Sequence, residues 1–326
     1  MQLESIELCA GAGGQALGLE MAGFSHRALI DIDKDACATL RLNRPAWKVV
    51  EADLWDAVEG KVEEFQPKSF QGVDLVAGGV PCPPFSKAGK QLGDQDERDL
   101  FPAALRLVAI CQPRAIMLEN VRGILDPVFD EYRRQLDDRL RELEYDPQWR
   151  LLNASHFGVP QLRPRVVLVA MRRRYASNFR WPDHRFTRTA PTVGEALYRQ
   201  MASRGWKGAE KWKVRANTIA PTLVGGSKKH GGPDLGPTRA KRAWAALGVD
   251  GHGIADDPPG PNFVGTPRLT VEMAAALQGF PPGWQLVGRK TSAYRQVGNA
   301  FPPPVAEAVG SCIFEALTAA TAVRAA

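Results

Sequence analysis

Short apolar runs, bounded by glycine, proline or acidic residues, recur along the first half of the chain. They cover residues 6–10, 28–30, 49–53, 73–77, 115–118 and 166–170. Runs of this kind are typical of strands that are buried on both faces of a parallel sheet. Stretches with apolar residues at helical spacing lie between them, at 17–24, 100–108 and 129–143. This alternation predicts an α/β fold with a doubly wound sheet.

A glycine-rich turn follows the first predicted strand, and we expect a helix to begin near its end. The turn has the pattern Gly11-x-Gly13-x-x-Ala16, and Asp31 ends the second strand twenty residues after Gly11. Glycines allow close approach of the backbone, and the amides at a helix N-terminus attract ligands. An acid at the end of the second strand typically accepts hydrogen bonds from ribose hydroxyls. The pattern predicts an adenosine-containing cofactor, and taken alone it also fits an NAD enzyme.

The run at 73–77 leads into the loop 78–86, in which Cys82 stands between prolines. Proline fixes φ, so this loop is expected to hold one shape. Ligands of open parallel sheets bind outside the carboxyl ends of the strands. A thiol held there is a candidate nucleophile, although a lone cysteine more often fills a turn. Glu119 ends the next run and is expected to lie in the same crevice as a proton donor or acceptor.

Two arginines, Arg163 and Arg165, flank a proline just before the run at 166–170. Guanidinium groups next to a buried strand are costly unless they meet anions or polar ligands. Both are therefore candidate site residues, with structural ion pairs as the equally favoured alternative.

Composition narrows the class of protein. The chain has 326 residues and is 44% hydrophobic, enough for one large domain or two unequal ones. Because no stretch of about 18 apolar residues and no signal-peptide pattern is found, a cytoplasmic protein without membrane contact is expected. The five cysteines form no C-x-x-C pair, which argues against a metal site and a disulfide framework.

Charge is distributed unevenly along the chain. The net charge is +6, but residues 171–290 carry 20 Lys and Arg against 8 Asp and Glu. Such asymmetry indicates a surface that binds a polyanion, most often nucleic acid. Periodicity weakens after residue 171, while glycine, proline and tryptophan accumulate among the basic residues. The segment is too long and too apolar for a disordered linker, so we expect a second, smaller domain of irregular structure.

Taken together, the motifs resemble those of the DNA (cytosine-5) methyltransferases. Six matches occur in that family's order, at residues 8–14, 81–82, 119–121, 161–165, 277–281 and 296–299. The resemblance covers nearly the whole chain. It implies a Rossmann-like methyltransferase sheet in a catalytic domain (1–171 plus 291–326) and a small DNA target-recognition domain (172–290).

The resemblance also implies S-adenosylmethionine as the cofactor, rather than NAD. Asp31 would bind the ribose, Ile32 the adenine face and Asp53 the adenine amine. The remaining residues expected to contact the cofactor are Cys9, Gly11, Gly13, Gly14, Leu54, Leu100 and Asn299.

The implied reaction begins with addition of the Cys82 thiolate to C6 of a flipped cytosine, which makes C5 nucleophilic. Glu119 would hold the base at N3 and the exocyclic amine, and Arg165, with Arg163 behind it, would bind the carbonyl. Candidate DNA contacts are Ser86, Thr222, Leu223, Lys228, Lys229 and Arg239. Duplex DNA is the expected partner of a monomeric, nucleoid-associated enzyme, and a restriction endonuclease could accompany it.

The sequence departs from the family's pattern at two places. Cys9 replaces a phenylalanine that usually stacks on adenine, and Pro83-Pro84 replaces a polar residue after the cysteine. Three rival functions are an RNA-cytosine methyltransferase, an NAD-dependent oxidoreductase and a catalytically silent DNA-binding regulator. The Cys-Phe-Thr tripeptide that is typical of the RNA-methylating branch does not occur in this sequence. An NAD-dependent oxidoreductase would give Cys82 and Glu119 no shared role. A catalytically silent regulator would not explain why both residues are present.

Overall fold

The structure is a computed structural model that describes residues 2–81, 99–225 and 232–322, with side chains described up to residue 319. Four residues predicted to act on DNA or on the base lie outside the described residues: Cys82, Ser86, Lys228 and Lys229. The two prolines after Cys82 also lie outside them.

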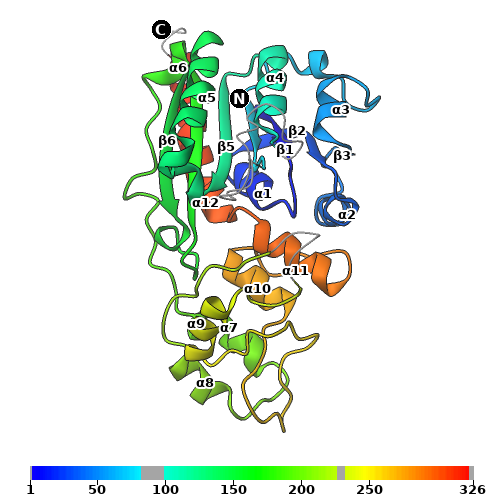
Figure 1. Cartoon of the computed structure of the whole chain (residues 1–326), viewed down its shortest axis with the longest axis vertical. Coiled ribbons are helices and arrows are strands. Elements are labelled where there is room, and N and C mark those ends of the chain that lie inside the picture. Colours follow the sequence, from blue (N-terminus) through cyan, green and yellow to red (C-terminus); the bar gives the residue numbers. More distant parts are fainter. Residues whose placement is uncertain (1, 82–98, 226–231, 323–326) are drawn as a thin grey trace.

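A mixed sheet forms the upper part of the molecule in Figure 1, and in the described residues it has seven strands in the order β3-β2-β1-β4-β5-β7-β6. β1 to β5 run parallel, whereas β7 is antiparallel to both β5 and β6. The strands are β1 (Leu3–Leu8), β2 (Phe24–Asp31), β3 (Val49–Glu51), β4 (Leu75–Gly78), β5 (Ala115–Val121), β6 (Tyr145–Asn153) and β7 (Pro164–Arg172). The predicted α/β class is confirmed, and the edge strand β6 is an addition that the apolar runs did not predict.

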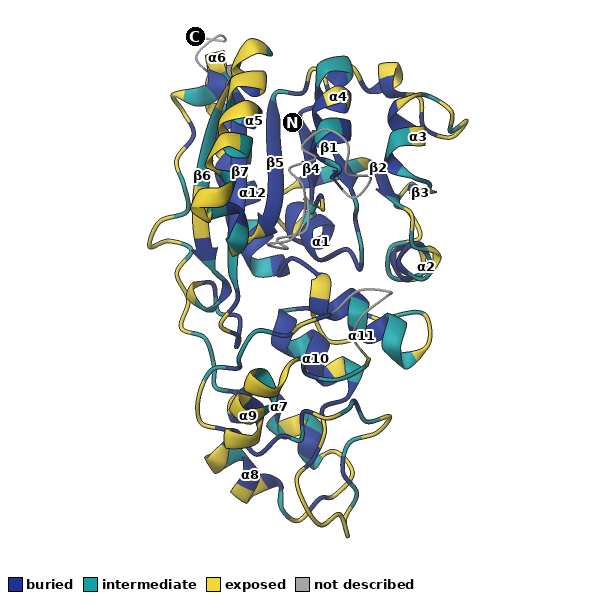
Figure 2. Ribbon diagram, viewed as in Figure 1, coloured by how far each residue is buried: buried dark blue, intermediate teal, exposed yellow. Residues whose placement is uncertain are grey.

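The central strands are apolar on both faces because helices cover both faces of the sheet. Val76 and Ile116 point into one core cluster, with residues of α3 (Leu54–Val58), α4 (Phe101–Cys111) and α5 (Asp130–Glu142). Ala77 and Met117 point to the other face, into a cluster with α1 (Gly14–Met21) and α12 (Pro303–Ala322). Figure 2 shows these strands as almost entirely buried. Two-sided burial explains the continuous apolar runs.

The strand order switches direction at β1, and this switch point determines where a ligand can bind. β1 lies between β2 and β4, so the chain builds the sheet outward in two directions from β1. In such sheets the crevice for ligands opens outside the carboxyl ends of the strands at this point. The glycine turn after β1 and the loop after β4 both begin there. The glycine turn packs against Leu40 of α2 (Lys34–Asn43).

The segment from about residue 172 onward contains more regular structure than the sequence predicted. Besides the short α6 (Arg173–Ala176), it holds α7 (Val193–Ala202), α8 (Ala209–Arg215) and α9 (Thr238–Ala246). Trp206, Trp212 and Trp244 are buried in a core cluster that also includes Ala12 and Leu17 near the start of the chain, so they stabilise this part of the chain from inside. The cluster continues into α10 (Val271–Gln278) and α11 (Lys290–Asn299), which lie between α7–α9 and the sheet (Figure 1). No helix within the described ranges is long and apolar enough to cross a membrane.

Candidate active site

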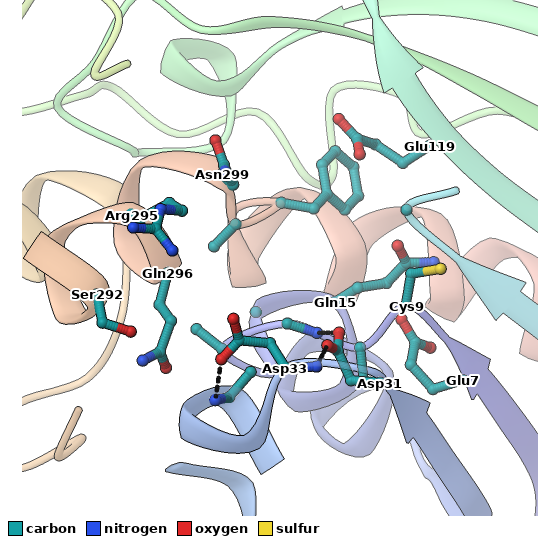
Figure 3. A pocket seen from close by; sticks show the side chains of 18 residues that line it. Glu7, Cys9, Gln15, Asp31, Asp33, Glu119, Ser292, Arg295, Gln296 and Asn299 are labelled. Carbon is teal, nitrogen blue, oxygen red and sulfur yellow. Dashed lines mark hydrogen bonds between the residues drawn. The ribbon is translucent and has the colours of Figure 1, made fainter. Parts of the chain in front are cut away.

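A cavity of about 230 Å³ opens at the carboxyl ends of the central strands. Its walls come from the end of β1, the residues after β2, the loop after β4, Glu119 on β5 and the face of α11 (Figure 3). Of the predicted cofactor contacts, Cys9, Gly11, Gly14, Asp31 and Asn299 line this cavity. Ile32, Asp53, Leu54 and Leu100 do not line it, and neither does Gly13.

The glycine turn has the tight backbone that the sequence predicts. Gly13 has φ 83°, and a Cβ on it would lie 2.6 Å from a methyl group of Leu40. At Gly14 a Cβ would lie 2.2 Å from the carbonyl oxygen of Phe301. Neither position has room for a side chain, because the start of α1 packs directly against α2 and the segment after α11. The turn can therefore approach a ligand closely at its glycines, of which Gly11 and Gly14 line the cavity.

Asp31 fixes this turn before any ligand is bound. Its two carboxylate oxygens accept from the backbone N–H groups of Gly11 and Asp33, each at 2.7 Å (Figure 3). A carboxylate oxygen has two lone pairs, so Asp31 keeps the capacity to accept from a ligand hydroxyl. Asp53 is an N-cap, accepting from the N–H of Trp55 at 2.8 Å at the start of α3. The side chain of Leu54 belongs to the sheet core, and Ile32 is 66% exposed.

Cys9 occupies an unusual position for a residue with a side chain. Its φ is 51°, in the left-handed region that non-glycine residues seldom adopt. Burial raises the pKa of its thiol, and the negative charges of Asp31 and Glu7 raise it further. The thiol is therefore protonated and unreactive, and it acts as a small apolar wall of the cavity.

Glu119 and Arg165 form an ion pair at the edge of the cavity. Glu119 Oε1 lies 2.7 Å from Arg165 Nε, and both side chains are almost buried. Arg165 pairs with Val121 on the antiparallel strands β5 and β7, which places it on the same face as Glu119 two residues along. Burial raises the pKa of Glu119, although Arg165 and Arg163 act in the opposite direction. A carboxyl group with a raised pKa is suited to donating a proton.

The loop that carries Cys82 begins beside this ion pair. Asn120 Nδ2 donates to the carbonyl oxygen of Val80 at 3.0 Å. A Cβ on Gly79 would lie 3.2 Å from Glu119 Oε2. The carbonyl oxygen of Pro81 accepts from the N–H of Leu100 at 3.1 Å. The described residues on both sides of segment 82–98 are thus held together next to Glu119.

Arg163 is fully buried and lies away from the cavity lining. Its guanidinium donates to the carbonyl oxygens of Leu223 (2.9 Å), Gly298 (2.7 Å) and Ala300 (3.0 Å). Burial lowers the pKa of Arg163 well below its usual value, and Arg165 contributes in the same direction. These contacts make Arg163 a structural link between β7, the chain after α8 and the end of α11.

The residues predicted to contact DNA are placed in different environments. The side chain of Leu223 is buried in the tryptophan-containing core, and the hydroxyl of Thr222 donates to the carbonyl oxygen of Leu162. Arg239 is exposed on α9, as is Arg242 on the next turn. Only this helix therefore presents a predicted DNA contact as an exposed charged side chain among the described residues.

Several residues that line the cavity were not predicted from the sequence. Ser292 and Arg295 project from α11 toward it, respectively seven and four positions before Asn299 on the same helix (Figure 3). Helical spacing back from Asn299 is the signal that would have found both. Glu7 and Gln15 lie at the opposite end of the cavity. An acidic residue inside a buried strand run was the available signal for Glu7.

The chain is similar to known methyltransferases over nearly its whole length. The family model described as C-5 cytosine-specific DNA methylase matches residues 3–315. Type II methyltransferase M.NaeI of Lentzea aerocolonigenes is 58% identical over 97% of this chain and 75% of that protein. Type II methyltransferase M.NgoMIV of Neisseria gonorrhoeae is 53% identical over 97% of this chain and 99% of that protein. The solved Dnmt2 methyltransferase of S. pombe shares the fold, with a TM-score of 0.63 and 19% identity over 97% and 99% of the two chains.

Proposed function

Because the chain belongs to the C-5 cytosine-specific DNA methylase family and methylates cytosine from S-adenosylmethionine, we propose that Cys82, Glu119 and Arg165 carry the reaction. The observation that supports this assignment most directly is the 2.7 Å contact between Glu119 and Arg165 at the cavity edge. The described residue before Cys82 is tied to the same corner of the sheet through Leu100. The described residues on both sides of segment 82–98 therefore lie next to the proposed proton donor and the proposed cation.

The cavity residues fit a cofactor of this kind. The glycine turn brings backbone close to a ligand, Asp31 can still accept from a hydroxyl, and Glu7 is an acid buried in the wall. When bound, S-adenosylmethionine supplies an electrophilic methyl group. The turn and Asp31 would hold the adenosine part, and Asn299 would close the pocket from α11.

Cys82 acts on the base. Its thiolate adds to C6 of cytosine, and the ring electrons then make C5 nucleophilic. Once C5 carries the methyl group, loss of the C5 proton regenerates the double bond and expels the thiolate. This chemistry cannot take place inside a stacked duplex, so the base is flipped out at a cost of a few kcal/mol, on the order of that of unpairing one base.

Glu119 and Arg165 stabilise the adduct. The raised pKa of Glu119 lets the carboxyl group carry a proton, which it shares with N3 of the ring as charge develops there. Arg165 orients Glu119 through its Nε and donates from Nη1 to the carbonyl oxygen of Pro164, which leaves Nη2 for the base carbonyl. Because Glu119 and Arg165 are already paired before the base binds, their side chains need not reorganise during the reaction.

Residues 172–290 act as the target-recognition domain in this proposal. Their excess of basic residues and the three tryptophans buried among them support the assignment. The exposed Arg239 and the lysines Lys228 and Lys229 would contact phosphates, while the loops near Thr222 reach the base edges. We expect the protein to act as a monomer at the nucleoid. By analogy with its Type II relatives, it would protect the host from a companion restriction endonuclease.

Methyl transfer to defined DNA tests this function. The purified protein is incubated with S-adenosylmethionine and plasmid duplex, and the product is examined by bisulfite sequencing. We expect protected cytosines confined to one short sequence context. Methylation of transfer RNA with none of duplex DNA would contradict the DNA assignment, and absence of any transfer would contradict the function as a whole.

Lowering the positive charge at Lys228 and Lys229 is expected to weaken DNA binding and reduce its dependence on salt. Removing one phosphate contact lowers the slope of log Kobs against log salt by about 0.9. Fluorescence anisotropy across a salt series measures the slope for the Lys228→Ala, Lys229→Ala double variant. The control is Arg139→Ala on α5, where the arginine already pairs with Glu142 at 2.7 Å, and its slope should equal that of the wild type. An equal slope in the double variant would show that these lysines do not contact phosphate.

A further inference from the structure

Helix α9 is exposed along one side (Figure 2), and this side carries two arginines without a counter-charge. Arg239 and Arg242 are both exposed and lie three positions apart, so they share one face of the helix. Neither forms a hydrogen bond or an ion pair with another described residue. By contrast, Lys241 on the same helix pairs with Asp234 at 2.8 Å. The two guanidinium groups are therefore available to an acidic or hydrogen-bond-accepting partner.

The buried side of α9 is firmly attached to the rest of the chain. Trp244 is 0% exposed and belongs to the core cluster described above. Arg215 of α8 donates to the carbonyl oxygens of Ala245 (2.6 Å) and Ala246 (3.3 Å) at the C-terminal end of α9. Ala243 and Ala246, which are exposed next to the arginines, are small and leave room for close approach. The arginine-bearing face therefore has a fixed orientation and is open to a large partner.

The chain just before α9 is in contact with the wall of the cavity. A Cβ on Gly236, two residues before the helix, would lie 3.4 Å from a methyl group of Val224. The next residue is Gly225, where a Cβ would lie 2.5 Å from Oδ1 of Asn299. Asn299 lines the cavity together with Glu119. If a duplex delivers a flipped base to Glu119, we therefore expect its flanking base pairs to lie beside α9.

The length of α9 matches the width of the major groove. The helix has 9 residues and is therefore about 13.5 Å long at about 1.5 Å per residue. The major groove of B-DNA is about 12 Å wide and admits an α-helix. When α9 lies across the groove, its middle residue, Arg242, faces the base edges. Arg239 near one end and Arg215 at the other then face the phosphates on the two sides of the groove.

We propose that α9 is a DNA-recognition helix and that Arg242 determines specificity by binding a guanine near the target cytosine. The guanidinium group of arginine donates two parallel hydrogen bonds to O6 and N7 of guanine, a pattern that no other base pair presents in the major groove. The inference rests on the function proposed above and assigns part of its sequence specificity to one side chain. A phosphate contact by Arg242 is the competing explanation, and it would give affinity without specificity.

Methylation of duplexes with altered guanines tests the proposal. Bisulfite sequencing first gives the sequence context that the full-length wild type methylates. Each guanine of this context is then replaced in turn by 7-deazaguanine, which still pairs with cytosine but lacks the N7 acceptor. The value of kcat/KM for methyl transfer is measured for the wild type, Arg242→Ala and Arg239→Ala. Arg204→Ala is the control, because Arg204 is an exposed arginine of the same segment that already pairs with Asp257 at 3.0 Å.

We expect one guanine at which 7-deazaguanine lowers kcat/KM by about tenfold in the wild type and in Arg204→Ala. In Arg242→Ala the same replacement has no effect, and bisulfite sequencing shows that other bases are accepted at that position. Arg239→Ala keeps the effect of 7-deazaguanine, but its slope of log Kobs against log salt falls by about 0.9.

Two results would overturn the proposal. One is an equal effect of 7-deazaguanine in Arg242→Ala and the wild type, with the methylated context unchanged. The other is a wild type that is insensitive to the replacement at every guanine. Because Arg242 is exposed and has no partner within the described chain, its replacement by alanine is expected to leave the fold intact. Absence of methyl transfer to duplex DNA by the wild type would instead refute the function proposed above, and the inference with it.

Discussion

Replacing Cys82 with alanine is expected to reduce methyl transfer by more than about a thousandfold, because no other group can add to C6 of the base. Affinity for S-adenosylmethionine should stay within about twofold, since the described residues that line the cavity are all unchanged. Transfer of a labelled methyl group to duplex DNA gives the first quantity, and calorimetry gives the second. Cys312→Ala, at a buried thiol on α12, is the matched control and should retain activity.

A trapped adduct makes this prediction more specific. Duplex DNA with 5-fluorocytosine at the target position blocks the last step, because the fluorine cannot leave as a proton does. The wild type and Cys312→Ala should each give a protein–DNA species that survives denaturant, and Cys82→Ala should give none. Turnover by Cys82→Ala at the wild-type rate, or an adduct at another residue, would refute the assignment of the nucleophile.

The apolar runs predicted the strands of the sheet well, for a physical reason. Strands covered by helices on both faces need apolar residues at nearly every position, and β4 and β5 satisfy this condition. β6 does not, because it is an edge strand with several exposed residues, and its pattern was therefore not recognisable. The boundaries were less accurate, since Glu119 and Arg165 lie inside β5 and β7 rather than beyond their ends.

The second half of the chain was harder to predict from pattern alone. α7 has a capping box, in which Thr192 and Glu195 bond each other's backbone N–H groups, and this Thr-x-x-Glu pattern was visible in the sequence. Glycine and proline in the surrounding residues obscured it. The buried tryptophans were grouped with the basic residues around them, although only the structure shows that they face inward.

Side-chain partners depend on strand register, which the sequence does not specify. Arg165 meets Glu119 because β7 runs antiparallel to β5 with Arg165 opposite Val121. A shift by one residue would move Arg165 to the other face of the sheet. Arg163 shows the same limit, since its three carbonyl partners come from segments about 60 and 135 residues away along the chain.

Replacing Arg163 with methionine is expected to lower the free energy of unfolding by about 2–5 kcal/mol, because each buried carbonyl oxygen that loses its donor costs about 1–3 kcal/mol. The carbonyl oxygens of Leu223 and Gly298 would be left unpaired in the interior, whereas that of Ala300 keeps the amide of Gln278. The methionine side chain fills much of the volume of the arginine side chain. The loss of stability therefore comes from the missing hydrogen bonds rather than from a cavity.

Gly225 and Gly298 belong to the two segments that Arg163 joins, and their close contact makes the cavity wall sensitive to any shift of one segment against the other. A Cβ on Gly298 would lie 2.4 Å from the Cα of Gly225, so the chain after α8 and the end of α11 are in direct backbone contact beside the cavity wall. Without the guanidinium that joins them, we expect weaker binding of both S-adenosylmethionine and DNA under conditions where the variant is still folded. Urea denaturation and calorimetry measure the two effects. Arg199→Met, at an exposed arginine on α7, should change stability by less than about 0.5 kcal/mol. An Arg163→Met protein as stable as this control would show that the guanidinium does not hold the segments together.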